Sequence, residues 1–167
     1  MPRDQPDWRF LRSFDQARHD LVRDGAAKSD DEAAAILSEE SNEAQGYIEA
    51  QRWCGEIKAA YVAMIEPGVI SIFLFNQIPK RSGIDPYIWV VVGDIPSAYI
   101  PCFEIPRPYD ALSGYIYEMR RWSDAAIQGN SVEGLYPIGL EPTVELGRAL
   151  AKKVGFIERN ILPNLPH

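Results

Sequence analysis

The fold is decided by the stretch KAAYVAMIEPGVISIFLF (58–75), in which the turn signal Glu66-Pro67-Gly68 joins two runs rich in β-branched and aromatic residues. A third such run, YIWVVV (87–92), follows, and a short fourth strand is expected over 98–103. In the second and third runs apolar residues fall on both faces, whereas a sheet with one solvated face alternates apolar with polar residues. We therefore expect an antiparallel sheet of three to four strands, covered on both faces by helices or by a second subunit.

The residues before this sheet show the apolar spacing that is typical of helices. Residues 8–24 carry one apolar stripe that ends at Gly25. Ser29 then opens a capping box with an acid three residues later, and residues 33–53 continue with helical spacing. The polar stretch 38–42 could divide this second run, so the sequence predicts two or three helices before the sheet.

Two amphipathic helices are expected after the sheet. Pro108 and Pro142 each stand at the start of one, since proline suits the first helical position. The side chains predicted to face inward are Leu112, Ile116, Met119, Trp122 and Ala126 in the first, and Leu146, Leu150, Val154, Ile157 and Ile161 in the second. The predicted fold class is therefore α+β, with one domain over 1–167 and with helices packing on the sheet.

Residues 28–56, the acidic segment, carry most of the chain's negative charge. They hold two basic and eight acidic residues, a net of −6 within a chain of net charge −7. An acidic surface repels phosphate backbones, so no nucleic-acid partner is expected, whereas a basic protein partner would be steered toward it. Helix capping accounts for residues 30–32 but not for Glu39, Glu40 and Glu43. A solvated helical face that keeps the protein soluble is the alternative.

Cysteine and histidine counts limit the available chemistry. Cys54 and Cys102 are the two cysteines, and they form no CxxC motif. We expect them to be reduced, small buried hydrophobes, with a disulfide bridge as the alternative. The histidines are His19, which is expected to face solvent, and His167. A structural zinc site needs four closely paired ligands, so we expect no metal and no cofactor.

A strand-to-turn motif stands in the segment WVVVGDIPSAY (89–99). With the Pro-initiated helix that follows and its Trp, the pattern W-x3-GD[LI]P[ST]xY resembles a group of small uncharacterised bacterial proteins over roughly residues 86–162. That resemblance implies the fold and supplies no catalytic residues. The matched positions are Gly93, Asp94, Pro96 and Tyr99. We interpret them as a structural turn, because an Asp side chain accepts nearby backbone N–H groups and proline stops a β-ladder.

No catalytic signature occurs in the chain. Phosphate-loop, dinucleotide, zinc-protease and hydrolase-elbow patterns are all missing, so we expect a protein that is not an enzyme. A small enzyme with a carboxylate-based pocket near Asp94 and Glu104, also using Tyr99, is the alternative from another class. A third hypothesis is a homodimeric scaffold whose doubly apolar sheet packs against its twin.

The function we expect is that of a bacterial immunity-type protein, which binds and inhibits a basic toxin or effector domain. Three features motivate this hypothesis: the small size of the chain, the missing catalytic motifs and the concentration of acidic residues in one segment. Charge complementarity would come from Glu39, Glu40, Glu43 and Glu49, and Tyr47 would serve as an aromatic anchor.

The expected location is the cytoplasm. The opening MPRDQPDWRF has no apolar core of a signal peptide. No apolar run approaches the ~20 residues that a membrane span requires, so no membrane partner is expected.

Overall fold

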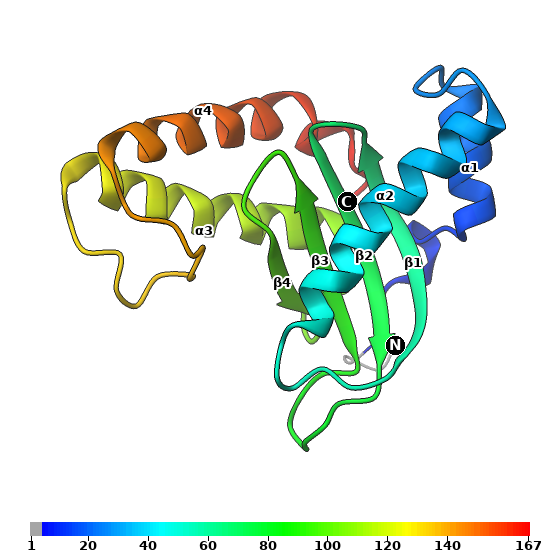
Figure 1. Cartoon of the computed structure of the whole chain (residues 1–167), viewed down its shortest axis with the longest axis horizontal. Coiled ribbons are helices and arrows are strands. Elements are labelled where there is room, and N and C mark those ends of the chain that lie inside the picture. Colours follow the sequence, from blue (N-terminus) through cyan, green and yellow to red (C-terminus); the bar gives the residue numbers. More distant parts are fainter. Residues whose placement is uncertain (1–4) are drawn as a thin grey trace. The chain divides into compact units, whose positions relative to one another are not determined.

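The computed structural model describes residues 5–167, and the chain forms two compact units, Met1–Pro106 and Arg107–His167. The first unit contains a 3-10 turn η1 (Trp8–Phe10), helices α1 (Phe14–Arg23) and α2 (Asp30–Glu49), and strands β1 (Ile57–Glu66), β2 (Ile70–Gln77), β3 (Tyr87–Gly93) and β4 (Ala98–Pro101). The second contains α3 (Pro108–Gln128), α4 (Val144–Asn160) and a 3-10 turn η2 (Leu162–Asn164) (Figure 1). The predicted α+β class is confirmed, while the single domain over 1–167 stays a prediction.

The strands form one antiparallel sheet in the order β1-β2-β3-β4. The β1–β2 hairpin closes through a hydrogen bond from Val69 N to Glu66 O at 3.0 Å, and Gly68 adopts a positive φ of 75° there. A glycine suits this position because it lacks the Cβ that disfavours a left-handed backbone. The predicted fourth strand is present but shorter than expected, since β4 ends at Pro101.

Both faces of the central strands are buried, as their sequence predicts. Residues 70–75 of β2 and residues 88–92 of β3 are all buried. On one face they belong to a hydrophobic cluster that also contains Ala17 and Leu21 of α1, and Leu37, Ala44 and Ile48 of α2. Figure 1 shows α2 running across this face of the sheet. That α3 and α4 pack on the sheet as well stays a prediction.

The first helix begins later than its apolar stripe predicts. Residues 8–10 form only the 3-10 turn η1, and the backbone of Arg12 makes an antiparallel bridge with Val62 of β1. Because those hydrogen bonds serve the sheet, the helix starts only after Ser13, whose Oγ accepts from Gln16 N at 3.1 Å.

Helix α2 is continuous across the polar stretch 38–42, so two α-helices precede the sheet within residues 5–167. The capping box differs in one detail from the expected pattern. Ser29 Oγ accepts from Glu32 N at 3.1 Å, but the Glu32 carboxylate accepts from Lys28 N rather than from the backbone of the cap residue itself. The helix also ends at Glu49, before the predicted Trp53, because residues 51–53 turn toward the sheet.

In the second unit α3 and α4 pack against each other through a close approach at Gly147. A Cβ there would stand 3.0 Å from Ala126 Cβ and 3.0 Å from Ser123 O. All five predicted inward residues of α3 are buried. In α4 the prediction fails for Leu146, which is 38% exposed, because the neighbouring Gly147 and Leu150 occupy the buried side of the helix.

Candidate functional site

The exposed side of α2 carries a stripe of acidic and small residues. Ala35, Glu39, Glu43 and Gly46 are all exposed and follow one another at spacings of four, four and three, which places them on one side of the helix. We call these four residues the acidic face of α2. The small residues leave room for the backbone of another protein to come close to the two carboxylates.

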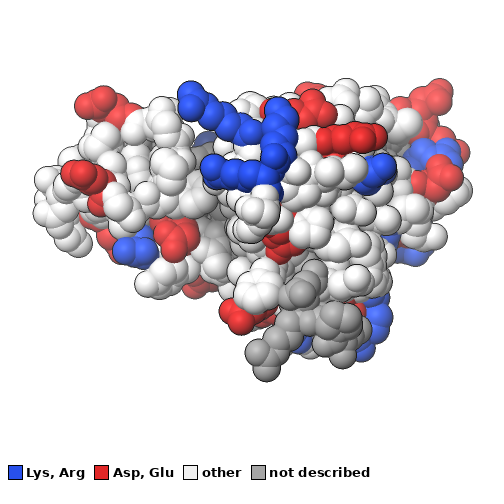
Figure 2. All heavy atoms as spheres, turned by 90° about the horizontal axis from the view of Figure 1, so that it is seen from below, with Lys and Arg blue, Asp and Glu red and all other residues white. Residues whose placement is uncertain are grey.

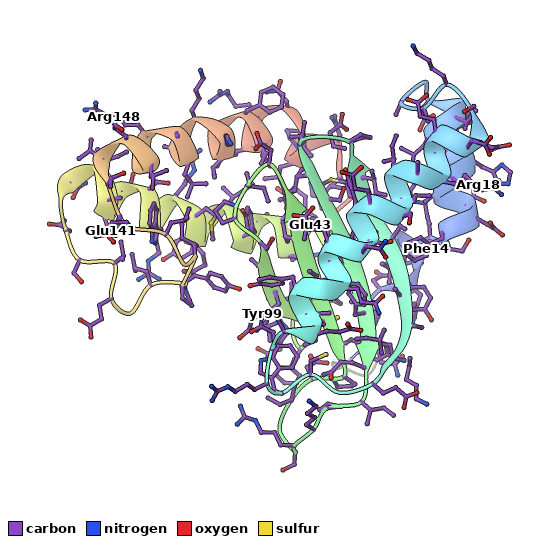
Figure 3. All side chains as sticks on the ribbon, viewed as in Figure 1. Phe14, Arg18, Glu43, Tyr99, Glu141 and Arg148 are labelled. Atoms are coloured by element: carbon purple, nitrogen blue, oxygen red, sulfur yellow. The ribbon has the colours of Figure 1, made fainter. Side chains whose placement is uncertain are left out.

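Neither carboxylate of the acidic face is neutralised within residues 5–167. No Lys or Arg of this described range lies within ion-pair distance of Glu39 or Glu43. At the start of the same helix, by contrast, Asp30 lies 3.6 Å from the guanidinium of Arg18 on α1. Figure 3 shows Arg18 and Glu43 on these two helices. Of these acids of α2, Asp30 is therefore paired with a cation, whereas Glu39 and Glu43 in the middle of the helix are not.

Two other predicted contact residues of α2 differ in their exposure. Glu49, the last residue of the helix, is exposed and accepts a hydrogen bond from Gln45 Nε2 at 2.8 Å. Tyr47 is half-buried, packs against the hydrophobic cluster and has its ring centre 6.4 Å from that of Tyr99. Tyr47 therefore offers only part of its ring to a partner.

Glu40 is turned away from the acidic face. Its carboxylate accepts a hydrogen bond from Ser71 Oγ on β2 and another from the backbone of Gly68. Burial, and secondarily the charges of Glu43 and Glu39, raise the pKa of Glu40 to about 7. The carboxylate is thus engaged between α2 and the β1–β2 hairpin and does not belong to the acidic face.

Glu40 makes stability depend on pH. Its pKa lies near 4.5 in the unfolded chain and near 7 in the folded one, so the folded state binds more protons between these values. The free energy of unfolding should therefore fall as pH rises from about 4.5 to 7 and level off above. Because the group is partly solvated, we expect Glu40→Gln to add about 1–2 kcal/mol at pH 8, less than the full shift implies.

Urea denaturation at pH 5 and pH 8 measures this effect. Glu40→Gln should reduce the difference between the two pH values, whereas the exposed control Glu56→Gln should keep it. An unchanged difference in Glu40→Gln would show that folding does not shift the pKa of this carboxyl.

The predicted turn lies where β3 ends. Gly93 has a φ of 146°, and a Cβ on it would stand 2.4 Å from Val69 O. The next residue, Asp94, donates its backbone N–H to that same oxygen at 3.1 Å. This close approach of two chain segments requires glycine at position 93 and fits the interpretation of the motif as a structural turn.

The structure does not bring together the carboxylates of the enzyme hypothesis. Asp94 follows the last residue of β3, while Glu104 lies beyond Cys102, whose N–H bonds to Tyr87 O at the first residue of β3. A seven-residue strand separates these ends by roughly 20 Å. Both carboxylates are exposed, whereas a catalytic pair needs burial or mutual repulsion to separate its pKa values.

Both cysteines are free and buried, as expected for small hydrophobic residues. Burial raises the pKa of the Cys102 thiol to about 12 and also raises that of Cys54. Thiols held in the protonated form are poor nucleophiles. Within the described part of the chain, no three His, Cys, Asp or Glu side chains are grouped to hold a metal ion. Nor does any helix there have the length and hydropathy to cross a membrane.

One feature that the sequence analysis missed is a pocket of about 740 Å³ in the first unit. It is lined by aromatic residues from three separate segments, Trp53, Tyr99 and Phe103, and by Arg81 and Asp85 of the β2–β3 loop. The aromatic residues and the basic residues of that loop were the available signals in the sequence. They were not recognised as one site because Trp53 and Phe103 lie 50 positions apart in the sequence.

No family model, curated protein or solved structure matches this chain. The resemblance that the strand-to-turn motif indicates therefore stays a prediction.

Proposed function

We propose that this chain is a binding protein that docks a basic protein on the acidic face of α2. The observation that supports this most is the pair of exposed carboxylates, Glu39 and Glu43, one helical turn apart and without a cation from the described residues. Like charges at this spacing cost an isolated helix about 0.2–0.5 kcal/mol, which a cationic partner would offset. Glu49 extends the negative surface toward the end of the helix.

The partner we propose is a basic toxin or effector domain that the chain inhibits, as bacterial immunity-type proteins do. In this proposal α2 covers the active site of the partner, and electrostatic steering accelerates the encounter. A small chain whose candidate carboxylates Asp94 and Glu104 lie beyond opposite ends of β3 suits a protein that acts by occupying a surface. The cytoplasmic location and the option of a homodimer remain predictions alongside this proposal.

Affinity capture with charge-reversed variants tests the proposal. The tagged wild-type chain, Glu39→Lys/Glu43→Lys and Glu133→Lys/Glu141→Lys are exposed to lysate of the source organism, and bound proteins are quantified by mass spectrometry. The last variant is a matched control, since it makes the same net change at two exposed positions between α3 and α4, one of them labelled in Figure 3.

A basic protein should be retained by the wild type and by the control, and at least about tenfold less by the α2 variant. Each reversal replaces attraction by repulsion, on the order of 1 kcal/mol per site. Equal retention by all three chains would reject the acidic face as the docking surface. Inhibition is tested separately, by adding the chain to the captured protein and following the activity of that protein.

A further inference from the structure

The pocket of the first unit is built from segments that the fold fixes firmly. Gln77, which is 1% exposed, accepts from Gly55 N with Oε1 at 3.0 Å and donates through Nε2 to Asp85 O at 3.0 Å. This one buried side chain therefore ties the segment after α2 to the β2–β3 loop. The backbone adds a second tie, from Lys80 N to Trp53 O at 3.0 Å.

The segment after β4, which also lines the pocket, is held in place by the carboxylate of Asp85. One oxygen accepts from Tyr87 N at 2.8 Å and the other from Phe103 N at 2.6 Å. Both oxygens are thus engaged with backbone N–H groups, which places the segment after β4 against the loop. The pocket is preorganised, and preorganisation lowers the entropic cost of binding a ligand.

Apolar side chains, three of them aromatic, form most of the lining of this pocket and are incompletely covered. The rings of Trp53 and Tyr99 meet edge to face with centres 4.9 Å apart. Phe103 is 51% exposed although it lines the same pocket, and Ile88 contributes apolar surface from β3. A concave site with aromatic walls and few polar groups is the usual form of a small-molecule site, and a flat ring would cover the exposed apolar surface.

The lining holds one acid, Asp85, whose two oxygens already accept from backbone N–H groups, and one base, Arg81. Arg81 lines the pocket and takes part in no ion pair with the residues that the structure describes. Arg52 and Lys80 are the chain neighbours of Trp53 and Arg81, and the bond from Lys80 N to Trp53 O brings these segments together. Figure 2, which views the end from which the β2–β3 loop projects in Figure 1, shows a group of Lys and Arg side chains there.

We propose that this pocket binds a small aromatic carboxylate, with its ring against the Trp53–Tyr99 pair and Phe103 and its carboxylate on the guanidinium of Arg81. A single planar guanidinium matches a carboxylate, because its N–H groups can donate two parallel hydrogen bonds. The proposal does not depend on the acidic face of α2. Failure of either one leaves the other intact.

Calorimetric titration with 2-naphthoate and with its neutral isostere 2-naphthamide tests this assignment. The wild type should bind the carboxylate about tenfold more tightly than the amide. Arg81→Gln should remove that preference while leaving the affinity for the amide unchanged. Lys28→Gln is the matched control, with the same loss of charge, and should behave as the wild type. Lys28 precedes α2, roughly 30 Å from the end of that helix near Trp53.

A second variant tests the aromatic part of the site. Phe103→Ala should lower the affinity for both probes at least about fivefold. Because Phe103 is exposed, the variant should still fold, and circular dichroism checks that it does. Three results would overturn the proposal: no binding of naphthoate to the wild type, equal affinity of the wild type for both probes, or unchanged naphthoate affinity in Arg81→Gln. Unchanged affinity for both probes in Phe103→Ala would place any binding elsewhere and would overturn it too.

Discussion

Gly55→Ala should lower the free energy of unfolding by about 3 kcal/mol or more. A Cβ at position 55 would stand 1.8 Å from Ile78 O, a backbone atom that cannot rotate away. Relieving this overlap requires the two segments to separate, which would cost about 1–3 kcal/mol as overpacking. It would also pull Gly55 N from the buried amide of Gln77, and an unsatisfied buried acceptor costs about 1–3 kcal/mol more.

The matched control is Gly46→Ala, on the exposed side of α2. Nothing lies within 4 Å of the Cβ that this change adds, and alanine is the better helix former. The same substitution should therefore raise the free energy of unfolding by about 0.5–1 kcal/mol. Urea denaturation followed by circular dichroism gives both values. Similar changes in the two variants would contradict the tight approach at Gly55.

Phe73→Ala should cost about 3–5 kcal/mol, because the ring of Phe73 is fully buried where α1 and α2 meet the sheet. Phe73 stacks on Phe14 of α1, labelled in Figure 3, with centres 6.1 Å apart and planes 13° from parallel. It also stands opposite Val62 and Val90 in the ladder, so its removal leaves a cavity bordered by several elements.

Thermal unfolding measures this loss as a decrease of about 10 °C in Tm. Phe103→Ala removes a ring of the same size from a half-exposed position and should change Tm by no more than about 3 °C. A decrease in Phe73→Ala no larger than that of this control would mean that the core around β2 is not what holds the first unit together.

Local patterns predicted most of the architecture. The runs 69–75 and 87–92 are apolar on both faces, and the burial of β2 and β3 follows directly from this composition. The caps were equally visible, since Ser29 caps the start of α2 and Gly25, with a φ of 79°, follows the end of α1. These features depend on residues close together in sequence, which a pattern can capture.

The features that the sequence did not predict depend on distant contacts. The late start of α1 follows from the bridge between Arg12 and Val62, 50 positions apart. Glu40 resembled its acidic neighbours in sequence, yet Ser71 and Gly68 engage its carboxylate. Among the residues expected to contact a partner, Glu39, Glu43 and Glu49 are exposed. Helix geometry places them on the side of α2 that faces away from the sheet, and this spacing can be read from the sequence.

The pocket illustrates the same limit. Trp53, Arg81 and Phe103 carry no spacing signal, and the ties through Gln77 and Asp85 become apparent only once the strands are paired. Conversely, Asp94 and Glu104 are near in sequence but lie beyond opposite ends of a strand. Proximity along an antiparallel hairpin is therefore a poor guide to a catalytic pair.

The most direct test of the docking proposal is the association rate constant between this chain and the purified captured partner, measured by stopped flow at low and high ionic strength. The wild type and Glu133→Lys/Glu141→Lys should associate fast at low salt and at least about tenfold more slowly at high salt, because salt screens electrostatic steering. Glu39→Lys/Glu43→Lys should associate slowly at both. A rate constant for that α2 variant equal to the wild-type value at low salt would contradict the account.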